Sequence, residues 1–522
     1  MTSRRARPAA AVGAGILLSR ITGLARDVAF AAFLGTRVGA DAYWAAIRIP
    51  NIIRNLLGEG TLSASFVPVY SEILRGEDEK ARGGRLASDV LGVVIGAATL
   101  LSGLGILLAP LLTRLIAPGF DAAATQLTVS LVRILFPMSG LLIVGAWCLG
   151  VLNSHRRFFL PFVAPVLWNL SQVGGLLLGA RLGWTPLVVV LAWSALLGSL
   201  LQVGFQLPVA RRLAGTLRPS FRWSWEPTRR VIRNTGPVIS SQGIFQISSF
   251  VDVLLATLLG TGALSSLAYA QRLVYLPLSL FGISVAAASL PEMSRETAPE
   301  ALRPRITGGF LSILFYVLPS AVLLLLFGDL VIRTVYLRGQ FSQASAAFVG
   351  GVLIAYALGL VATSSIKLFA SGFHALQDTR TPMRIAAASV GTGIALGAPL
   401  ALGLRGAGWG PLAAVGLALG GAAGAWLNLL LLWRALTRRV GRLLGGPEIR
   451  VILRLAAGTV AAAGAGALVR SLVEPRLAHL GLAGTLATLG AVLLAGAGPY
   501  LAIAGPAPRR GLPLARREAD DA

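Results

Sequence analysis

The sequence has very few cysteines and histidines, and this excludes several kinds of site. Cys148 is its one cysteine, so neither an intrachain disulfide nor a cysteine-based metal cluster can form. The three histidines, His155, His374 and His479, lie far apart and show no spacing typical of metal ligands. No carboxylate pair, Ser/His/Asp set or phosphate-binding loop of the Walker type indicates hydrolysis or group transfer. These absences favour a function other than catalysis.

Charged residues are also scarce for a chain of this length. Only 13% of the 522 residues are charged and 55% are hydrophobic, whereas soluble proteins carry about 25% charged residues. Apolar runs of about 20 residues, each long enough to cross a bilayer as a helix, recur from end to end. The sequence therefore predicts an all-α polytopic membrane protein.

The charge that is present is mostly positive, with a formal net charge of +25. The basic residues lie in short loops between apolar runs rather than on an amphipathic surface, so we expect no nucleic-acid partner. Lysine is nearly absent, since Lys80 and Lys367 are the only two. Arginine supplies the remaining positive charge.

The apolar runs predict fourteen transmembrane helices. The start, MTSRRARPAAAVGAGILLS, resembles a signal peptide, but Arg20 interrupts it and more spans follow, so we expect a retained first helix. Pro50, Pro68, Pro237 and Pro277 are expected to mark kinks or breaks. The predicted spans are 9–34, 40–71, 86–116, 124–152, 159–180, 185–209, 232–259, 264–293, 306–328, 344–375, 383–403, 408–434, 451–471 and 480–504.

The loops of this arrangement differ strongly in positive charge. The N-terminus and every second loop together carry 31 basic residues, the opposite side carries 8, and 7 lie within spans. Cytoplasmic loops are the ones enriched in Lys and Arg. Both termini are therefore expected in the cytoplasm, which requires an even number of helices.

An internal repeat divides the chain. Residues 34–68 begin with LGT, contain Arg48 and end in FVP, and residues 259–291 begin with LGT, contain Arg272 and end in SLP. Two six-helix halves in the same orientation would be related by a pseudo-two-fold axis along the membrane normal, and substrates of such transporters bind between the halves. The predicted parts are an N-lobe at 1–215, a C-lobe at 216–440, and two further helices with a cytoplasmic tail at 441–522.

Polar residues cluster within the first two spans, although a charge at the centre of a membrane helix costs about 2.5–3.5 kcal/mol. On the first span, Arg20 and Asp27 are seven residues apart and nearly aligned, with Arg26 beside them. An ideal helix would also align a set of polar residues in the second span, with Arg54 off that stripe. That set is Asp41, Arg48, Asn51, Asn55 and Glu59.

Two interpretations of these charges compete. In the first, they pair internally: Arg26 with Asp27, Arg48 with Asp41, and Arg54 with Glu59. In the second, the surplus of about two cations in the spans meets an anionic ligand in a wet cavity, and arginine suits phosphate because its planar fork donates paired hydrogen bonds. The other half of the repeat adds Asp252, Gln271 and Arg272, and Lys367 adds a cation to the tenth span.

The stretches that carry these residues resemble the MurJ (MviN) family of lipid II flippases, in the MOP superfamily of exporters. The resemblance runs from the first predicted helix through the twelfth. The matching stretches are SRITGLARD, DAYWAAIRIPNIIRNLLGEGTLSASFVPVYSE, APGF, LPFVAPVLWNLSQ, AYAQRLVYLPLSLFGISVAAASLP, YLRGQF and FHALQDTRTP.

This resemblance implies two six-helix lobes with an arginine-lined central cavity, which works by alternating access. The implied substrate is lipid II, an undecaprenyl-diphosphate-linked muropeptide, moved from the inner to the outer leaflet of a bacterial cytoplasmic membrane. The implied substrate-binding residues are Arg20, Arg26, Arg54 and Arg272, and the last two helices are similar to those forming a groove for the lipid tail. Membrane lipids, and proteins of cell-wall synthesis or division, are further implied partners.

Some positions depart from the family pattern. Many relatives have an acidic residue where Gln271 stands, and some use an acid such as Asp252 with Asn residues of the eleventh helix to bind sodium. Here that helix reads IAAASVGTGIALGAPLALGL, without Asn or Asp. We therefore expect no cofactor and no metal, and membrane potential becomes the alternative to a monovalent coupling ion, since one charge crossing 100 mV yields about 2.3 kcal/mol.

Other functions stay open at this point. One is a flippase for another polyprenyl-diphosphate-linked saccharide, and a second is a drug exporter, although a cavity for cationic drugs would be acidic. A third is a membrane enzyme, or a scaffold for envelope synthesis that binds lipid II without moving it. Enzymes acting on polyprenyl phosphates need carboxylates for Mg²⁺, and the loop EILRGEDEKARGGR is more typical of a solvated linker.

Overall fold

The computed structural model describes residues 3–75, 79–215, 217–220, 223–295 and 299–506. Every regular element in these ranges is a helix, and they contain no strand. By its internal contacts the chain divides into unit 1, residues 1–264, and unit 2, residues 265–522. The all-helical fold predicted from the sequence is confirmed.

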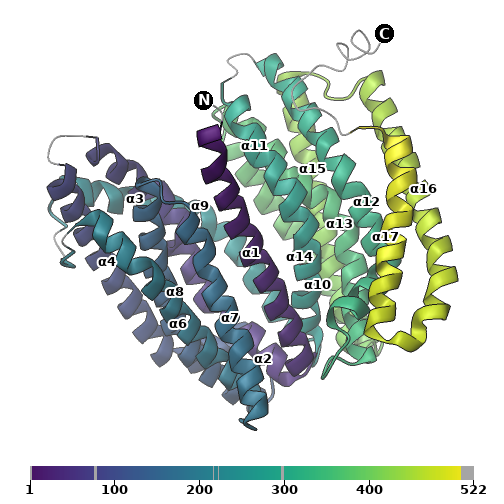
Figure 1. Ribbon diagram of the computed structural model, residues 1–522, viewed down its shortest axis with the longest axis horizontal. Coiled ribbons are helices and arrows are strands. Elements are labelled where there is room, and N and C mark those ends of the chain that lie inside the picture. The colour runs from purple at the N-terminus through teal and green to yellow at the C-terminus, as the bar shows by residue number, and fades with distance from the viewer. Residues whose placement is uncertain (1–2, 76–78, 216, 221–222, 296–298, 507–522) are drawn as a thin grey trace. The chain divides into compact units, whose positions relative to one another are not determined.

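Unit 1 is built around α6, which packs on α2, α3, α4 and α8, while α1 packs on α7. Figure 1 labels most of these helices, from purple α1 to teal α9. Their bounds are α1 (Ser3–Leu34), α2 (Val38–Leu57), α3 (Glu59–Ile73), α4 (Glu79–Leu107), α5 (Ala109–Ile116), α6 (Ala122–Ser154), α7 (Phe159–Arg181), α8 (Leu187–Ala214) and α9 (Glu226–Thr257).

One hydrophobic core of unit 1 forms where α3, α4 and α6 meet. The rings of Phe66 and Tyr70 stack with 5.0 Å between their centroids, and Trp147 and Cys148 are fully buried beside them. Such close packing of large side chains holds neighbouring helices in one register. It fixes α3, and with it the end of α2, against the rest of the unit.

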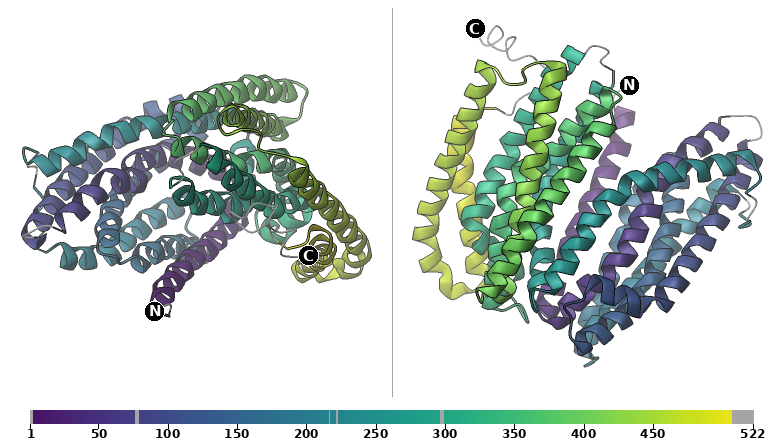
Figure 2. Two further views of the ribbon diagram at one scale, coloured as in Figure 1. Left: turned by 90° about the horizontal axis from the view of Figure 1, so that it is seen from above. Right: turned by 180° about the vertical axis from the view of Figure 1, so that it is seen from behind.

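Unit 2 consists of long helices in hairpins, of which α14–α15 and α16–α17 are the clearest (Figure 2). The unit begins in the first turn of α10. Its elements are α10 (Ala263–Pro277), the π-helical η1 (Leu278–Ile283), α11 (Ser284–Met293), η2 (Pro299–Ala301), α12 (Leu302–Tyr336), α13 (Gln343–Ala375), α14 (Arg380–Gly406), η3 (Gly410–Ala413), α15 (Ala414–Val440), α16 (Gly446–Leu477), η4 (Ala478–Leu480) and α17 (Leu482–Ala504).

Within the described residues, 11 helical segments are long and apolar enough to cross a membrane. They coincide with the third to sixth and the eighth to fourteenth predicted spans. The other three predicted spans coincide with α1, α2–α3 and α9, which carry most of the polar candidate residues. The chain is a multi-pass helical membrane protein, and the count of fourteen spans stays a prediction.

The breaks within the predicted spans differ from those expected at proline. Pro50 and Pro68 lie inside α2 and α3, and the second span breaks at Gly58 instead. The third span breaks at Leu108, between α4 and α5. At Pro277 the expectation holds, because the π-helix η1 follows it. Membrane helices tolerate proline when neighbouring groups satisfy the freed backbone, so proline alone is a weak predictor of breaks.

The helix ends show that the internal repeat extends well beyond the LGT and arginine motifs. α6 and α13 end in the same way, with Arg156 at φ 59° and Gln377 at φ 58°. In both, the next backbone N–H bonds the carbonyl five residues earlier: Arg157 to Leu152, and Asp378 to Phe373. This is the hydrogen-bond pattern of a Schellman ending, found 221 residues apart.

The following helix pairs also end alike. Two residues after the ends of α7 and α14 lie Gly183, φ 70°, and Gly408, φ 86°, each followed by a tryptophan. Directly after α8 and α15 lie Gly215, φ 84°, and Gly441, φ 83°. Glycine adopts this left-handed backbone without the Cβ penalty of other residues. The turns that follow equivalent helices of the two copies are therefore alike. The lobe boundaries 1–215 and 216–440 stay a prediction.

Candidate functional site

α1 carries a buried ion pair of the candidate site. Nε and Nη2 of Arg26 donate to Oδ1 of Asp27 at 3.1 and 2.8 Å. Arg26 is 7% exposed and Asp27 is 6% exposed. The predicted pairing of Arg26 with Asp27 is thus confirmed, and their two charges offset each other.

α7 completes the surroundings of Arg26. Nη1 of Arg26 donates to Oδ1 of Asn169 at 3.0 Å, and its guanidinium carbon lies 5.0 Å from the ring centroid of Trp168. On α1 itself, the ring of Phe30 lies 5.7 Å away. Cations are attracted to aromatic faces within about 6 Å. Asn169 and Trp168 fall in the LPFVAPVLWNLSQ stretch, but the sequence did not indicate what they contact.

Arg20 lies two turns before Arg26 on α1 and is half-buried. The neighbouring carbonyl of Ser19 accepts a hydrogen bond from Nδ2 of Asn169 at 3.2 Å. The same amide nitrogen donates to Oγ1 of Thr22 at 3.1 Å. The stretch of α1 that carries Arg20 is therefore attached directly to α7.

The first half of α2 is tied to α9 and to the turn that follows it. Asp41, 2% exposed, accepts a hydrogen bond from the backbone N–H of Gly262 at 2.6 Å. Nε of Arg48 donates to the carbonyl of Ser249 at 3.2 Å, and Asp252, one turn further along α9, lies within electrostatic range of Arg48. The predicted pairing of Arg48 with Asp41 stays a prediction.

The second half of α2 carries Asn51, Arg54 and Asn55, of which the first two are half-buried and Asn55 is exposed. Arg54 lies in the last turn of the helix, where a cation is favoured by the helix dipole. A Cβ at Gly58 would lie 2.3 Å from the carbonyl oxygen of Arg54, so only glycine fits at this break. The backbone at Arg54 is thus in close contact with the backbone at Gly58.

The break at Gly58 corrects one sequence expectation. Asp41 and Glu59 were expected on one face of a continuous helix, but α2 ends at Leu57 and Glu59 opens α3. The ideal-helix count therefore does not place Glu59 on the stripe, and its side chain lies outside the described part of the structure. Asp41, Arg48, Asn51 and Asn55 do share α2.

Three candidate residues belong to unit 2. Gln271 and Arg272 are exposed side chains of α10, and Lys367 is an exposed side chain of α13. Arg272 stands 224 residues after Arg48, as Gly282 in η1 stands 224 residues after Gly58. Both copies of the repeat are thus irregular at equivalent positions, and the meeting of Arg272 with the arginines of α2 stays a prediction.

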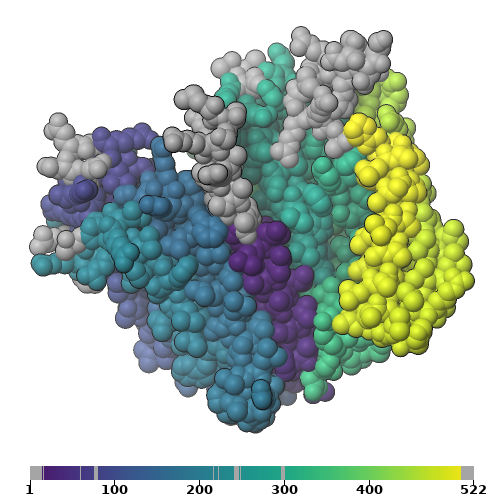
Figure 3. All heavy atoms as spheres, in the orientation of Figure 1, coloured from purple at the N-terminus to yellow at the C-terminus, as the bar shows by residue number. Residues whose placement is uncertain are grey.

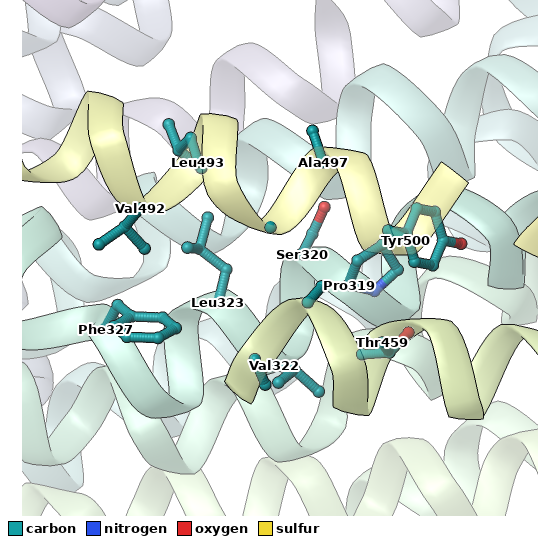
Figure 4. A pocket seen from close by; sticks show the side chains of 13 residues that line it. Pro319, Ser320, Val322, Leu323, Phe327, Thr459, Val492, Leu493, Ala497 and Tyr500 are labelled. Carbon is teal, nitrogen blue, oxygen red and sulfur yellow. The ribbon is translucent and has the colours of Figure 1, made fainter. Parts of the chain in front are cut away.

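Unit 2 also contains an apolar groove between α12, α16 and α17. Its inner part is a cavity of about 210 Å³ lined by all three helices, including Leu323, Phe327, Thr459, Val492 and Tyr500 (Figure 4). A second hollow of about 490 Å³ lies beyond Phe327, beside Arg470 and Glu474. The side chains of α16 and α17 cover this edge of the unit (Figure 3).

An ionic network closes one end of the groove. Arg470 of α16 bonds both carboxylate oxygens of Asp329 on α12, and its Nε donates to Glu474 at 2.7 Å. Glu474 also accepts from Nη1 of Arg333 at 2.7 Å. At the other end, the hydroxyl of Tyr500 donates to the carbonyl of Phe315. These bonds fasten the α16–α17 hairpin to α12.

Across the described residues, no three His, Cys, Asp or Glu side chains are grouped so as to hold a metal ion. Among the ionisable groups of the spans, Arg26 bonds Asp27, and Arg48 bonds the backbone carbonyl of Ser249.

Comparison with known proteins finds relatives that agree with one another in family. Residues 30–486 match the family model of the lipid II flippase MurJ. A probable lipid II flippase MurJ of Rhizobium tropici is 35% identical over 438 residues, covering 82% of this chain and 80% of the relative. The lipid II flippase MurJ of Burkholderia cenocepacia is 32% identical over 435 residues, covering 81% and 82%.

Solved structures match in fold. A lipid II flippase MurJ in an inward closed conformation matches with a TM-score of 0.76 over 94% of this chain and 98% of that chain, at 23% identity. An inward-facing MATE-family transporter of the MOP superfamily matches with a TM-score of 0.62 over 80% and 95%, at 14% identity. At these sequence identities the matches show similarity of fold alone.

Proposed function

The chain belongs to the family of the lipid II flippase MurJ, and from this membership we propose that it moves lipid II across the cytoplasmic membrane. Lipid II is the undecaprenyl-diphosphate-linked precursor of peptidoglycan, and movement is from the inner to the outer leaflet. The family and its structural neighbours are transporters, so the activity is transport and not catalysis. The match over residues 30–486 carries the proposal.

The arginines within the membrane spans would bind the diphosphate of the substrate. Arg20 and Arg54 lie on half-buried stretches of α1 and α2, and Arg272 is exposed on α10. A guanidinium donates paired hydrogen bonds to phosphate oxygens and keeps its charge at any physiological pH. Arg26 belongs to the same proposed set through family resemblance, and in the structure it also bonds Asp27 and Asn169.

The proposed mechanism is alternating access between two lobes with an arginine-lined cavity. Asp41, Arg48, Asn51, Asn55, Glu59, Asp252, Gln271 and Lys367 would supply its other polar groups. The lipid tail would stay in an apolar environment, and the groove of α12, α16 and α17 offers one. An undecaprenyl chain is driven there by the same burial of apolar surface that drives folding.

Energy would come from membrane potential or a monovalent ion rather than from a bound cofactor. The eleventh predicted helix corresponds to α14 and has no Asn or Asp to complete a sodium site with Asp252. Movement of a charged headgroup or arginine through part of the potential is therefore the favoured source, at about 2.3 kcal/mol per charge and 100 mV.

The proposed location is the cytoplasmic (inner) membrane of a bacterium, with both termini in the cytoplasm. The excess of basic residues in the N-terminus and every second loop supports this orientation. Membrane lipids surround the protein, and proteins of cell-wall synthesis or division are the expected neighbours of a lipid II flippase.

The experiment is replacement of an essential flippase. Cells depleted of their own lipid II flippase are given this gene, and outer-leaflet lipid II is measured with an externally added probe or enzyme. Restored growth and exposure of lipid II are expected. Failure by a protein that is expressed and inserted would contradict the proposal. Binding of lipid II without restored exposure would favour a non-transporting scaffold, and exposure of another polyprenyl-diphosphate saccharide would favour a flippase of different headgroup specificity.

A further inference from the structure

The linker between α8 and α9 contacts the first half of α4, in the two pieces that the structure describes, 217–220 and 223–225. The backbone N–H of Arg218 donates to the hydroxyl of Ser88 at 3.2 Å. The backbone N–H of Ser220 donates to the carbonyl of the same serine at 3.4 Å. The path of the linker backbone over α4 is therefore defined by hydrogen bonds.

A buried carboxylate of α4 adds side-chain bonds to this contact. Asp89 is 1% exposed, and it accepts hydrogen bonds from the hydroxyl of Ser220 and, at 3.2 Å, from that of Thr228 in the first turn of α9. One turn further along α4, a Cβ at Gly92 would lie 2.2 Å from the carbonyl oxygen of Ser220. Only glycine permits so close an approach of the linker.

The apolar side chains of the linker divide into an inner and an outer set. Leu217 and Trp225 pack against the hydrophobic core where α3, α4 and α6 meet. The guanidinium carbon of Arg85 on α4 lies 4.6 Å from the ring centroid of Trp225. Trp223, by contrast, is 67% exposed. Tryptophan is enriched where a membrane meets water, because one part of the ring is apolar and its N–H is polar.

The contacts with α4 fix the depth of the linker in the membrane. They extend along α4 from Arg85 to Gly92, about 10 Å of helix. The third predicted span begins at residue 86, so this is where α4 enters the bilayer. The polar layer on each side of a bilayer is about 5–8 Å thick. Trp223 therefore lies near the level of the lipid headgroups when α4 spans the membrane.

The charge around Trp223 is almost entirely positive. Residues 211–233 contain seven arginines and one acid, Glu226. On the expected orientation the linker adjoins the cytoplasmic leaflet, and anionic lipids of that leaflet attract clusters of four to eight basic residues beside a membrane helix. The exposed arginines of this segment are Arg211, Arg212, Arg218, Arg229 and Arg233.

We propose that the linker is a binding surface for anionic phospholipids, in which Trp223 lies among the headgroups and the arginines on either side of it bind their phosphates. A guanidinium donates paired hydrogen bonds to phosphate oxygens. An acidic protein segment would be attracted by the same charges, but the depth of Trp223 favours lipid. The inference uses the membrane-spanning fold and does not depend on which substrate is transported.

The experiment places a fluorophore on the linker of the full-length protein in lipid nanodiscs. Trp223→Cys is labelled, because Cys148 is 0% exposed and so is protected from the reagent. Quenching is compared between brominated phosphatidylglycerol and brominated phosphatidylcholine at equal mole fraction. We expect both lipids to quench, and the anionic lipid to quench roughly twofold more strongly because the arginines concentrate it.

A charge variant and a matched control test the role of the arginines. R218Q/R229Q, made in the labelled protein, should quench equally with both lipids. R303Q/R384Q removes two exposed arginines from α12 and α14 and should keep the preference. Raising salt should weaken the preference in the protein that keeps all these arginines, so the test does not depend on folding of R218Q/R229Q.

Three results would overturn the inference. Absence of quenching by either lipid would place the linker outside the headgroup layer. A preference for phosphatidylglycerol that R218Q/R229Q retains, or that R303Q/R384Q loses equally, would show that other charges cause it. Equal quenching by the two lipids, with binding of polyglutamate to the linker, would favour an acidic protein partner instead.

Discussion

The carboxylate of Asp41 accepts a hydrogen bond from the backbone N–H of Gly262, with 2.6 Å between the nitrogen and Oδ2. Gly262 has φ +97° in the turn between α9 and α10, and a Cβ there would lie 3.0 Å from the carbonyl oxygen of Thr36. The turn after α1 and the turn after α9 are therefore in contact within unit 1. The two LGT motifs that revealed the repeat lie in these two turns.

Replacing Asp41 by Ala should destabilise this contact. A hydrogen bond to a buried charged group contributes about 1.5–3 kcal/mol, and Asp41 is 2% exposed. We expect D41A to lower the thermal midpoint of the purified protein, whereas D41N, which keeps an acceptor oxygen, lowers it less. Equal midpoints for D41A and wild type would mean that the bond to Gly262 contributes little.

The arginines proposed to bind the diphosphate should be required for transport but not for folding. Arg54→Ala and Arg272→Ala are each expected to abolish rescue of flippase-depleted cells at normal expression. Each removes a charge-assisted contact to phosphate, while Arg272 is exposed and Arg54 is half-buried. Rescue is measured beside protein level in membranes. Full activity in both variants would contradict the anion-binding mechanism.

The sequence predicted the helices of this fold well because apolar run length and charge are local properties. Each predicted span coincides with a helix or with a broken helix, and Arg26–Asp27 is a pair between neighbours in sequence. The sequence could not predict that Arg26 bonds Asn169, 143 residues away, or that Arg48 bonds the Ser249 carbonyl, 201 residues away. Periodicity gives the face of a helix but not the helix that covers it.

The glycine break at the end of α2 should be intolerant of a side chain. In Gly58→Ala the new Cβ would lie 2.3 Å from the carbonyl oxygen of Arg54, so the backbone of α2 must shift. We expect loss of flippase rescue, because Arg54 moves with that backbone. Gly103→Ala in α4 is the matched control, since its Cβ meets nothing within 4 Å. The control should rescue fully, and equal activity of the two variants would refute a role for the break.

The ionic network of Arg470 should decide how firmly the α16–α17 hairpin is held. Arg470 is bonded to Asp329 and Glu474, and Glu474 also accepts from Arg333. R470A leaves Asp329 without its bidentate partner, so we expect easier proteolysis between α16 and α17 and a lower thermal midpoint. The network is partly exposed, and exposed ion pairs contribute only about 0–1 kcal/mol each.

A salt titration checks this interpretation of the network. Ionic strength screens partly exposed charges, so the difference in midpoint between wild type and R470A should shrink as salt is raised. Phe315→Leu is the control, because it keeps the backbone carbonyl that accepts from Tyr500 and all four charges. A difference that is constant from low to high salt would point to lost packing of the arginine stem instead.

Acid should loosen the loop between α13 and α14. Asp378 accepts from the backbone N–H of Thr381 at 3.0 Å and from its hydroxyl at 2.7 Å, and it pairs with Arg439 at 2.7 Å. These bonds, the backbone one first, lower the pKa of Asp378 to about 2. An unfolded aspartate has a pKa of about 3.9.

The sign of the pH effect follows from this depressed pKa. The charged form is favoured in the folded state, so its contribution is complete above about pH 4 and is lost as pH falls through about 2. We expect the difference in thermal midpoint between wild type and Asp378→Asn to be constant from pH 8 to 5 and to shrink below pH 4. A difference that changes between pH 8 and 6 instead would show that another group governs the loop, because Asp378 stays ionised throughout that range.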